Sequence, residues 1–415
     1  MRLLYSILWL IALPFAFLHL TLRARRQPEY LGHWGERLGL APITPEGRPL
    51  IWLHAVSVGE TRAAAPLVKA LRARHPQHHI LLTHATPTGR ATGRELFGDD
   101  VAQCYLPYDF PPLVWLFLRR VRPRLGVIME TEIWPNLFAG CARRGIPLFL
   151  VNARLSEKSA RGYSRFPALT QAALNRLTGI AAQTAADARR LGDLGADRVE
   201  ISGNVKFDVT APVNSQEAAE ALRGLFSGRF VFLAASTREG EEALLLDALS
   251  GLTLPDLLLV LVPRHPQRFD AVAEMLHQRN LATVRRSARQ MPSAATRVFL
   301  GDSMGELAAY YAAADVAYVG GSLVPLGGQN LIEAAAAGCP ALIGPHTWNF
   351  AEAAEQAVAC GAAQRVADAG ELAATLEGLY RDANTRARMR EAGLNFAATN
   401  RGATARVMAM LERHL

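Results

Sequence analysis

The sequence LIWLHAVSVGETRAAAPLVKALRARHPQHHILLTH, residues 50–84, predicts a strand, a helix and a second strand. It opens with an apolar run at Leu50–His54, continues with a helix-forming segment at Thr61–Arg74, and returns to an apolar run at Ile80–Thr83. The helix is expected to end before His75–Pro76, because proline disfavours a helical conformation in the residue that precedes it. Strand, helix and strand in this order are typical of a parallel sheet covered by helices.

The same alternation continues along the chain, with one break. Further strand candidates in the first half are Val101–Leu106, Leu125–Met129, Pro147–Val151 and Gly179–Ala182. The segment Asp208–Ser215 has no helical periodicity and is typical of a linker. Strand candidates then resume at Phe230–Ala234, Leu257–Val262, Ala282–Val284, Arg297–Leu300, Val316–Val319 and Ala341–Ile343. The pattern predicts an α/β protein with two Rossmann-like domains, residues 23–208 and 209–415, and with ligands bound outside the carboxyl ends of the strands.

The composition is that of a globular protein with a basic surplus. Half of the 415 residues are hydrophobic, a fifth are charged, and the formal net charge is +8. This balance favours an anionic partner, such as an acidic lipid surface or a phosphorylated substrate. Nucleic acid is the least favoured partner, because the sequence has no RNA-binding aromatic signature and no run of five or more basic residues.

The cysteines and histidines do not predict a metal site. None of the four cysteines lies in a C-x-x-C pair: Cys104, Cys141, Cys339 and Cys360. We therefore expect free thiols in a reducing compartment. His75, His78 and His79 lie close together, but no cysteine or carboxylate completes a ligand set, so a solvated loop is favoured over a metal site.

The N-terminal segment is apolar enough to bind a membrane. Residues Leu3–Leu22 are almost wholly apolar, and about 20 such residues at ~1.5 Å each cross a hydrocarbon core of ~30 Å. Arg23, Arg25 and Arg26 follow, and the positive-inside rule then places the rest of the chain in the cytoplasm. A cleaved secretory signal is disfavoured, because the run is long and lacks a small-residue cleavage pattern. The anchor is predicted over residues 1–22, either spanning the membrane or lying in one leaflet.

Charged residues follow the predicted strands of the first half. Glu60 lies just after the first strand, at the start of a helix, where it either complements the helix dipole or acts as a general base. Glu130 and Glu132 follow a later strand. Glu130 is expected to point into the ligand cleft. One of the two carboxylates is expected to serve only as a helix-start residue. A hydrolase that uses both carboxylates as a pair stays open at this point. Lys206 lies where the chain leaves the first half. It either stabilises a developing negative charge or is a solvated residue of the linker.

The loops of the second half predict a nucleotide site. Arg264 lies in a stiff loop between two prolines, which suits a fixed phosphate contact. Polar loops with glycines also follow the strands, at residues 235–241, 301–306, 320–322 and 327–330. Glycines before a helix bring backbone N–H donors close to a phosphate. Asn330 and Glu333 form either a capping box or a ribose site, and we favour the ribose site.

Several nucleotide-dependent classes lack their motifs here. No G-x-G-x-x-G follows the first strand of either half, and no G-x-x-x-x-G-K-[ST] occurs, which disfavours hydride transfer and ATP hydrolysis. No Asp-x-Asp pair is present to hold a metal–diphosphate complex. We therefore expect cationic side chains and helix dipoles, without a metal or other cofactor, to stabilise a leaving phosphate.

Taken together, these loops resemble the 3-deoxy-D-manno-octulosonic acid (Kdo) transferases of lipopolysaccharide biosynthesis. The matching strings are HAVSVGE (54–60), TPTG (86–89), METEIWPN (129–136), NARLS (152–156), KFD (206–208), VPRHP (262–266), GDSMGEL (301–307), GGQNLIE (327–333) and GPHTWNF (344–350). The likeness runs from the apolar N-terminus to the C-terminal helices. One departure is His84, where a smaller residue is expected, and it affects none of the assigned roles.

The resemblance implies a GT-B glycosyltransferase with two Rossmann-like domains facing a central cleft. It implies inverting transfer of Kdo from CMP-Kdo to an anionic lipid A precursor of the lipid IVA type, at the cytoplasmic face of the inner membrane and without a metal. Residues 23–208 would then bind the acceptor, and residues 209–415 would bind the CMP-sugar.

The resemblance also implies residue roles. Glu60 matches the general base, and Glu130 and Lys206 match residues that stabilise the transition state. The CMP-binding segments match Pro263, Arg264, Met304, Gly305, Glu306, Asn330, Leu331, Ile332 and Glu333. Two alternatives stay open: another GT-B transferase, for example one that uses a UDP-sugar, and a membrane-tethered nucleotide-binding module without activity.

Overall fold

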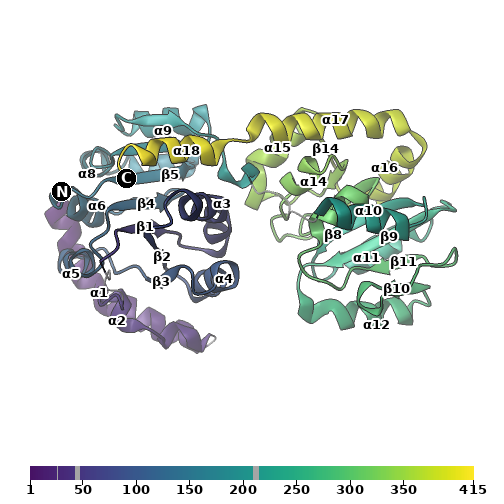
Figure 1. The fold of residues 1–415 in the computed structure, drawn as a ribbon, viewed down its shortest axis with the longest axis horizontal. Helices are drawn as coiled ribbons and strands as arrows, with labels where there is room; N and C mark the ends of the chain where they lie inside the picture. The colour runs from purple at the N-terminus through teal and green to yellow at the C-terminus, as the bar shows by residue number, and fades with distance from the viewer. Residues whose placement is uncertain (26, 43–46, 209–214) are drawn as a thin grey trace. The chain divides into compact units, whose positions relative to one another are not determined.

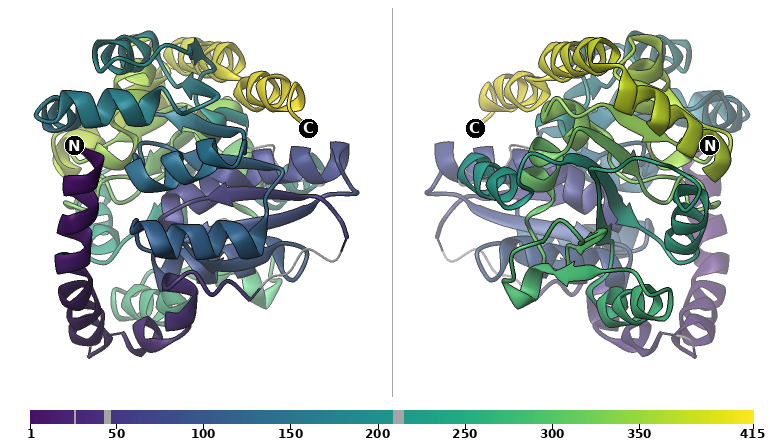
Figure 2. Two further views of the ribbon diagram at one scale, coloured as in Figure 1. Left: turned by 90° about the vertical axis from the view of Figure 1, so that its left-hand side faces the viewer. Right: turned by 90° about the vertical axis from the view of Figure 1, so that its right-hand side faces the viewer.

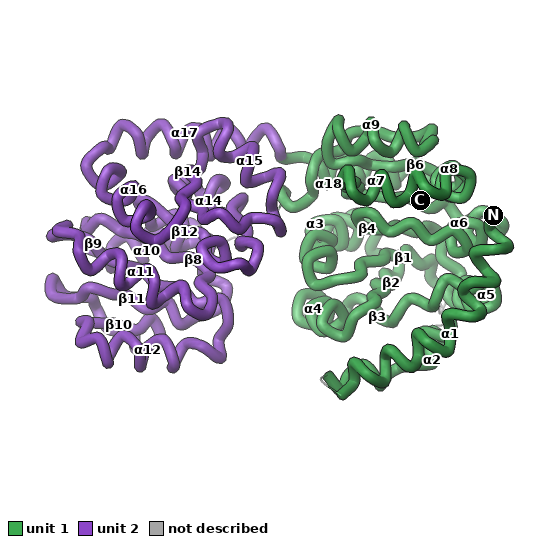
Figure 3. Tube along the Cα trace, turned by 180° about the vertical axis from the view of Figure 1, so that it is seen from behind, with its two compact units in different colours: residues 1–209, 401–415 green, residues 210–400 purple. Residues whose placement is uncertain are grey.

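The computed structural model describes residues 1–25, 27–42, 47–208 and 215–415 (Figure 1). It divides into two compact units, unit 1 (residues 1–209 and 401–415) and unit 2 (residues 210–400) (Figure 3). The predicted linker lies almost wholly outside the described residues.

Unit 1 is built on a seven-stranded sheet in which every strand pair is parallel, in the order β3-β2-β1-β4-β5-β6-β7. The strands are β1 (Leu50–His54), β2 (His79–His84), β3 (Ala102–Tyr105), β4 (Leu125–Met129), β5 (Leu148–Ala153), β6 (Gly179–Ala182) and β7 (Val199–Ile201). The helices are α1 (Arg2–Ala24), α2 (Trp34–Arg37), α3 (Val58–Arg74), α4 (Pro87–Phe97), α5 (Pro111–Val121), α6 (Pro135–Arg143), α7 (Glu157–Tyr163), α8 (Pro167–Leu174), α9 (Ala185–Asp193) and α18 (Ala403–Glu412), with 3₁₀ turns η1 (Pro28–Leu31) and η2 (Val205–Asp208).

Unit 2 repeats the design with the strand order β10-β11-β9-β8-β12-β13-β14, again parallel throughout. The strands are β8 (Phe230–Thr237), β9 (Leu257–Pro263), β10 (Thr283–Arg285), β11 (Val298–Leu300), β12 (Val316–Val319), β13 (Ala341–Ile343) and β14 (Ala363–Arg365). The helices are α10 (Ser215–Leu225), α11 (Glu241–Leu249), α12 (Phe269–Gln278), α13 (Leu307–Ala313), α14 (Ile332–Ala336), α15 (Ala351–Ala359), α16 (Ala369–Arg381) and α17 (Ala383–Asn400), with η3 (Pro266–Arg268), η4 (Arg286–Ala288) and η5 (Trp348–Phe350).

The sheet of unit 1 is covered on both faces, which explains why its strands are continuously apolar. Side chains alternate between the faces along a strand, so Leu50 and Trp52 join a core with α5, α6, α8 and α9. Ile51 and Leu53 join a second core with α3 and α18. The Trp52 indole N–H also donates to the Thr83 hydroxyl at 2.8 Å, so β1 and β2 are joined by a buried side-chain bond as well.

The predicted strands are confirmed, and each half adds one that the sequence did not reveal. The added strands, β7 and β14, are three residues long and lie at the edges of their sheets. Edge strands face solvent on one side and need no apolar run, so their sequences VEI and AQR carry little signal.

Helix α1 runs along the outside of unit 1 (Figures 1 and 2). It is long and apolar enough to cross a membrane. One face contacts unit 1: the rings of Trp9 and Tyr108 lie 5.7 Å apart, and Phe17 packs against Trp34 at 5.1 Å. The Ser6 hydroxyl adds a hydrogen bond to the Asn136 side chain at 3.1 Å.

The end of the chain departs from the predicted domain division. Residues 401–415 were expected in the second domain, but they belong to unit 1. The reason is the apolar face of α18, where Val407, Met408 and Leu411 are buried in the core that covers α3. An amphipathic C-terminal helix can complete either core, so its sequence alone does not choose between them.

Asp208 fixes this return of the chain. Its carboxylate accepts hydrogen bonds from the Gly402 and Thr404 N–H groups, at 2.6 and 2.5 Å, and so caps the N-terminus of α18. We expect Asp208→Ala to lower the free energy of unfolding by about 1 kcal/mol, the usual loss when a helix cap is removed. Urea denaturation measures this, with Asp197→Ala as an exposed control. Equal midpoints for the two variants would contradict the capping role.

Candidate active site

The first candidate residue, Glu60, lies in the first turn of α3, directly after β1. Ser57 caps this helix, and the Val56 N–H donates to Glu60 Oε2 at 2.7 Å while the Ser57 hydroxyl donates to Oε1 at 3.0 Å. Glu60 is only 9% exposed, and burial raises its pKa to about 7. The two hydrogen bonds oppose the rise, and the charges of Glu130 and Glu132 add to it. The capping role and a base of suitable strength therefore coexist in one carboxylate.

The other two predicted catalytic residues form a pair. Glu130 follows β4 in a left-handed backbone conformation, with φ of 57°. The Lys206 ammonium donates to Glu130 Oε1 at 3.3 Å, from the turn η2. Because β1 and β4 are parallel neighbours in the sheet, Glu60 and Glu130, which follow these strands, lie at the same edge of the sheet. The structure thus brings all three predicted residues to the carboxyl edge of the unit 1 sheet.

Glu132 belongs to the same group, whereas the sequence left it as either a helix-start residue or one of a carboxylate pair. Burial and, to a smaller extent, the charge of Glu130 raise the pKa of Glu132 to about 7. The signal was present in the string METE after β4, where only one carboxylate was assigned. Three carboxylates and one ammonium therefore gather at this edge, and the proton affinity of Glu60 depends on the other two carboxylates.

His84 and His75 have structural contacts. His84 is fully buried, and its ring nitrogens lie 3.1 Å from the Ala55 carbonyl and 3.1 Å from Gln103 Oε1. Burial lowers the pKa of His84 to about 4, so the ring is neutral at pH 7. His75 instead pairs with Glu412 at 3.5 Å. Within residues 1–25, 27–42, 47–208 and 215–415, no group of three or more His, Cys, Asp or Glu is arranged to hold a metal ion.

In unit 2, a buried carboxylate organises the glycine-rich loop after β12. Glu241 is fully buried, and it accepts hydrogen bonds from the Gly321 N–H at 2.7 Å, the Arg238 N–H at 2.9 Å and the Leu323 N–H at 3.2 Å. No residue with a side chain fits at position 320 in place of Gly320, because an added Cβ would lie 2.4 Å from the Ser236 carbonyl oxygen. The sequence predicts a polar loop around Glu241, but its role depends on contacts some 80 residues away that the sequence does not reveal.

The predicted nucleotide residues lie along the carboxyl edge of the unit 2 sheet. Pro263 ends β9, and the Arg264 side chain that follows donates from Nε to Gln329 Oε1 at 3.2 Å. This contact joins the loop after β9 to the loop after β12. Met304, by contrast, is 55% exposed and leaves its side chain open to solvent.

Glu306 is bound by an arginine outside the predicted site residues, Arg286. The Arg286 guanidinium binds both carboxylate oxygens, at 3.1 and 2.7 Å, and the Ser303 hydroxyl donates to one of them. Arg286 holds the pKa of Glu306 below its usual range. Gly305 adopts a φ of 83°, which glycine tolerates best, and the contact of Met304 and Gly305 with CMP stays a prediction.

The motif Asn330–Glu333 opens α14. The Asn330 side chain donates from Nδ2 to Glu333 Oε1 at 3.0 Å and accepts from the Ile332 N–H at 3.1 Å. Leu331 and Ile332 are buried. The pair is thus locally ordered at the start of a helix, and its contact with ribose stays a prediction.

Two Rossmann-like units, each built on a parallel seven-stranded sheet, form the GT-B fold that many glycosyltransferases share. Residues 228–396 match the family "Glycosyl transferases group 1". The fold is also that of the UDP-GlcNAc 2-epimerase from Neisseria meningitidis, with a TM-score of 0.58 over 88% of this chain and all of the other, at 14% identity.

Sequence comparison specifies the family. Residues 32–209 match the family described as 3-deoxy-D-manno-octulosonic-acid transferase. The chain is 44% identical to the enzyme of that name from Bordetella pertussis over 96% of both chains. It is 38% identical to the one from Haemophilus influenzae, over all of this chain and 99% of the other. The protein belongs to the Kdo transferase family and is a glycosyltransferase.

The raised pKa of Glu60 predicts a pH profile. A general base works only in its ionised form, so kcat/KM should fall as the pH drops below about 7 if Glu60 is that base. The charge of Glu132 contributes to the high pKa of Glu60, so Glu132→Gln should move the falling limb to lower pH. Initial rates between pH 5 and 9 measure both effects. A limb that stays in place in Glu132→Gln would show that another group sets it.

Proposed function

We propose that the protein transfers Kdo from CMP-Kdo to a lipid A precursor with inversion at the anomeric carbon, and that Glu60 is the general base. The observation that carries the proposal is a buried glutamate with a pKa of about 7, at the sheet edge that also holds the Lys206–Glu130 pair. The acceptor would bind to unit 1, and CMP-Kdo to unit 2. The sequence motifs of the Kdo transferases support this division.

The proposed reaction uses each group in turn. Glu60 takes the proton of an acceptor hydroxyl, whose oxygen attacks the anomeric carbon of Kdo as the bond to the CMP phosphate breaks. Positive charge develops on the sugar ring, and negative charge develops on the leaving phosphate. Arg264, Lys206 and backbone N–H groups at the helix starts of unit 2 are suited to stabilise the phosphate.

The transfer assay tests this function directly. Purified protein is incubated with CMP-Kdo and a lipid A precursor in detergent with EDTA, and the Kdo-bearing lipid is measured by mass spectrometry. We expect product from the wild type, a loss of about 10²–10⁴-fold in kcat for Glu60→Gln, and unchanged CMP binding in that variant.

Glu371→Gln is a matched control for the loss of a helix cap. Glu371 also lies in the first turn of a helix, accepts from the Ala367 N–H at 2.7 Å and donates its own N–H to the Asp368 cap, but it is exposed.

Competition with CMP and UDP distinguishes a different GT-B transferase. Wild-type protein that binds CMP but forms no product would favour a nucleotide-binding module.

We further propose that the protein sits at the cytoplasmic face of the inner membrane with α1 lying in one leaflet. In α1 the less exposed residues form one stripe: Arg2, Tyr5, Ser6, Trp9, Leu13, Ala16, Phe17, Leu20 and Ala24. The other face exposes large apolar side chains: Leu3, Leu4, Ile7, Leu8, Leu10, Ile11, Phe15, Leu18 and Leu22. A spanning helix would leave the protein body after its C-terminal turn, whereas contacts here continue to Ser6.

Cross-linking distinguishes the two orientations. Trp9 precedes Ala24 by a helical rise of about 22 Å at ~1.5 Å per residue, so a spanning α1 would hold residue 9 deep in the bilayer. In inner-membrane vesicles we expect a short bis-maleimide to join Trp9→Cys to Tyr108→Cys, in a Cys360→Ser background because Cys360 is exposed. Leu8→Cys, on the exposed face, should not join to Tyr108→Cys. Absence of the first cross-link would contradict the in-plane orientation.

A further inference from the structure

Lys206 lies in a short turn that cannot hold its shape alone. Turn η2 spans only Val205–Asp208, and a single 3₁₀ turn has few internal hydrogen bonds to keep it folded. The residues that follow, 209–214, lie outside the described part of the chain. The position of the Lys206 ammonium therefore depends on what holds the main chain of this turn.

Asn152 holds the start of the turn. It lies in β5, is fully buried, and its Oδ1 accepts a hydrogen bond from the Val205 N–H at 3.1 Å. Its backbone is left-handed, with φ of 54°, a conformation that asparagine tolerates better than most residues with a side chain. A strained backbone that places an amide on a neighbouring turn suggests a functional constraint.

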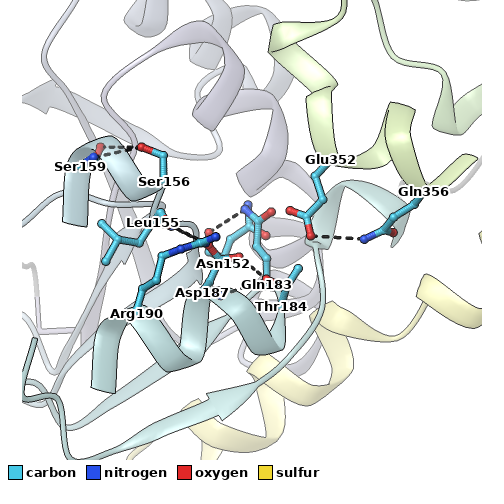
Figure 4. Close-up of polar contacts among 10 residues, drawn as sticks. All are labelled: Asn152, Leu155, Ser156, Ser159, Gln183, Thr184, Asp187, Arg190, Glu352 and Gln356. Carbon is cyan, nitrogen blue, oxygen red and sulfur yellow. Dashed lines mark hydrogen bonds and ion pairs between the residues drawn. The ribbon is translucent and has the colours of Figure 1, made fainter. Parts of the chain in front are cut away.

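Gln183 and Asn204 continue the contact to Lys206. The Gln183 side chain donates to the Asn152 carbonyl at 2.9 Å (Figure 4). It also accepts from the Asn204 side chain at 3.0 Å. The Asn204 Oδ1 then accepts from the Lys206 N–H at 3.0 Å. Gln183 is buried, so these bonds are shielded from water. We call Asn152, Gln183 and Asn204 the amide chain.

The other end of Lys206 is held from the adjacent strand. Met129 and Val151 are partners in the β4–β5 register, so Glu130 and Asn152 follow them at the same level of the sheet. Both have left-handed backbones. Asn152 contacts the main chain of the turn, and Glu130 contacts the ammonium at 3.3 Å. Residues at the ends of two neighbouring strands thus hold the main chain of the turn and the Lys206 ammonium.

We infer that the amide chain positions Lys206 for the transfer reaction, without touching the substrate itself. The inference rests on the proposed role of Lys206 as a residue that stabilises the transition state. An ammonium acts on developing charge only if it is placed before the reaction, because a displacement of about 1 Å can cost about 100-fold in rate. Amides suit this task, since they bond the turn without adding a charge that would shift the nearby carboxylates.

The neighbouring Thr184 provides a matched control. Its hydroxyl donates to Asp187 Oδ2 at 2.6 Å, and Asp187 Oδ1 accepts from the Leu155 N–H at 2.8 Å, which ties α9 to the loop after β5 (Figure 4). This group adjoins Gln183 in sequence, but its hydrogen bonds do not lead to Lys206. Thr184→Val should lower stability and leave kcat near the wild-type value.

A double-mutant cycle in the full-length protein tests the inference. We expect Gln183→Leu to lower kcat by about 10–100-fold while KM for CMP-Kdo changes less than about twofold, as for a misplaced catalytic group. In a Lys206→Ala background, Gln183→Leu should lower kcat no further. Asn204→Ala, at a half-buried position, should behave in the same way and serves if Gln183→Leu does not fold.

The outcomes separate the inference from the function on which it rests. Suppose that Lys206→Ala lowers kcat, but that Gln183→Leu or Asn204→Ala either has no effect or lowers kcat equally with and without Lys206. The positioning role of the amide chain is then wrong, and the role of Lys206 stands. If Lys206→Ala keeps the wild-type kcat, the role of Lys206 is wrong and the inference fails with it. Thermal unfolding of each variant, compared with Thr184→Val, shows whether a loss of rate merely follows a loss of stability.

Discussion

All strands in each sheet run in the same direction, and the candidate sites depend on this constraint. Because the chain leaves every parallel strand at the same edge, residues distant in sequence meet without any long loop. In unit 1, Glu60 follows β1 and Glu130 follows β4, its neighbour in the sheet. In unit 2, the loops after β9 and β12 meet through Arg264 and Gln329. In unit 1, helices on both faces of the sheet bury its strands in two apolar cores.

The same burial sets the chemistry of the unit 1 edge. Removing a carboxylate from water disfavours its charged form, and two further carboxylates nearby add to the effect. Glu60 therefore binds a proton more tightly than an ordinary glutamate does, with a pKa of about 7. Lys206 offsets part of this negative charge through Glu130. An acceptor that approached this edge would meet a base of useful strength beside a fixed ammonium, at some cost to the stability of unit 1.

The sequence was sufficient for the central strands of each sheet, because they are continuous apolar runs, and it also predicted the edge strands β3 and β10. It missed β7 and β14, whose exposed edges need no such run. It placed Glu60 and Glu130 correctly after their strands, since that inference needs only the order of elements, and it placed Lys206 where the chain leaves the first half. It could not predict that Arg286 binds Glu306, that Glu241 holds the glycine loop, or that residues 401–415 return to unit 1. Those contacts join residues that only the folded chain brings together.

The buried and half-buried carboxylates differ in how many of their lone pairs are already used. A carboxylate accepts about four hydrogen bonds. Glu241 receives three backbone N–H groups and the Tyr318 hydroxyl, so no acceptor site is left and its role is to shape the loop. Glu306 has both oxygens on Arg286. Among the described residues, Glu60 receives one backbone N–H and one hydroxyl, one on each oxygen. It thus retains lone pairs for a substrate hydroxyl, and the raised pKa makes those lone pairs basic. Of these three glutamates, only Glu60 combines a free acceptor site with an elevated proton affinity, which a general base requires.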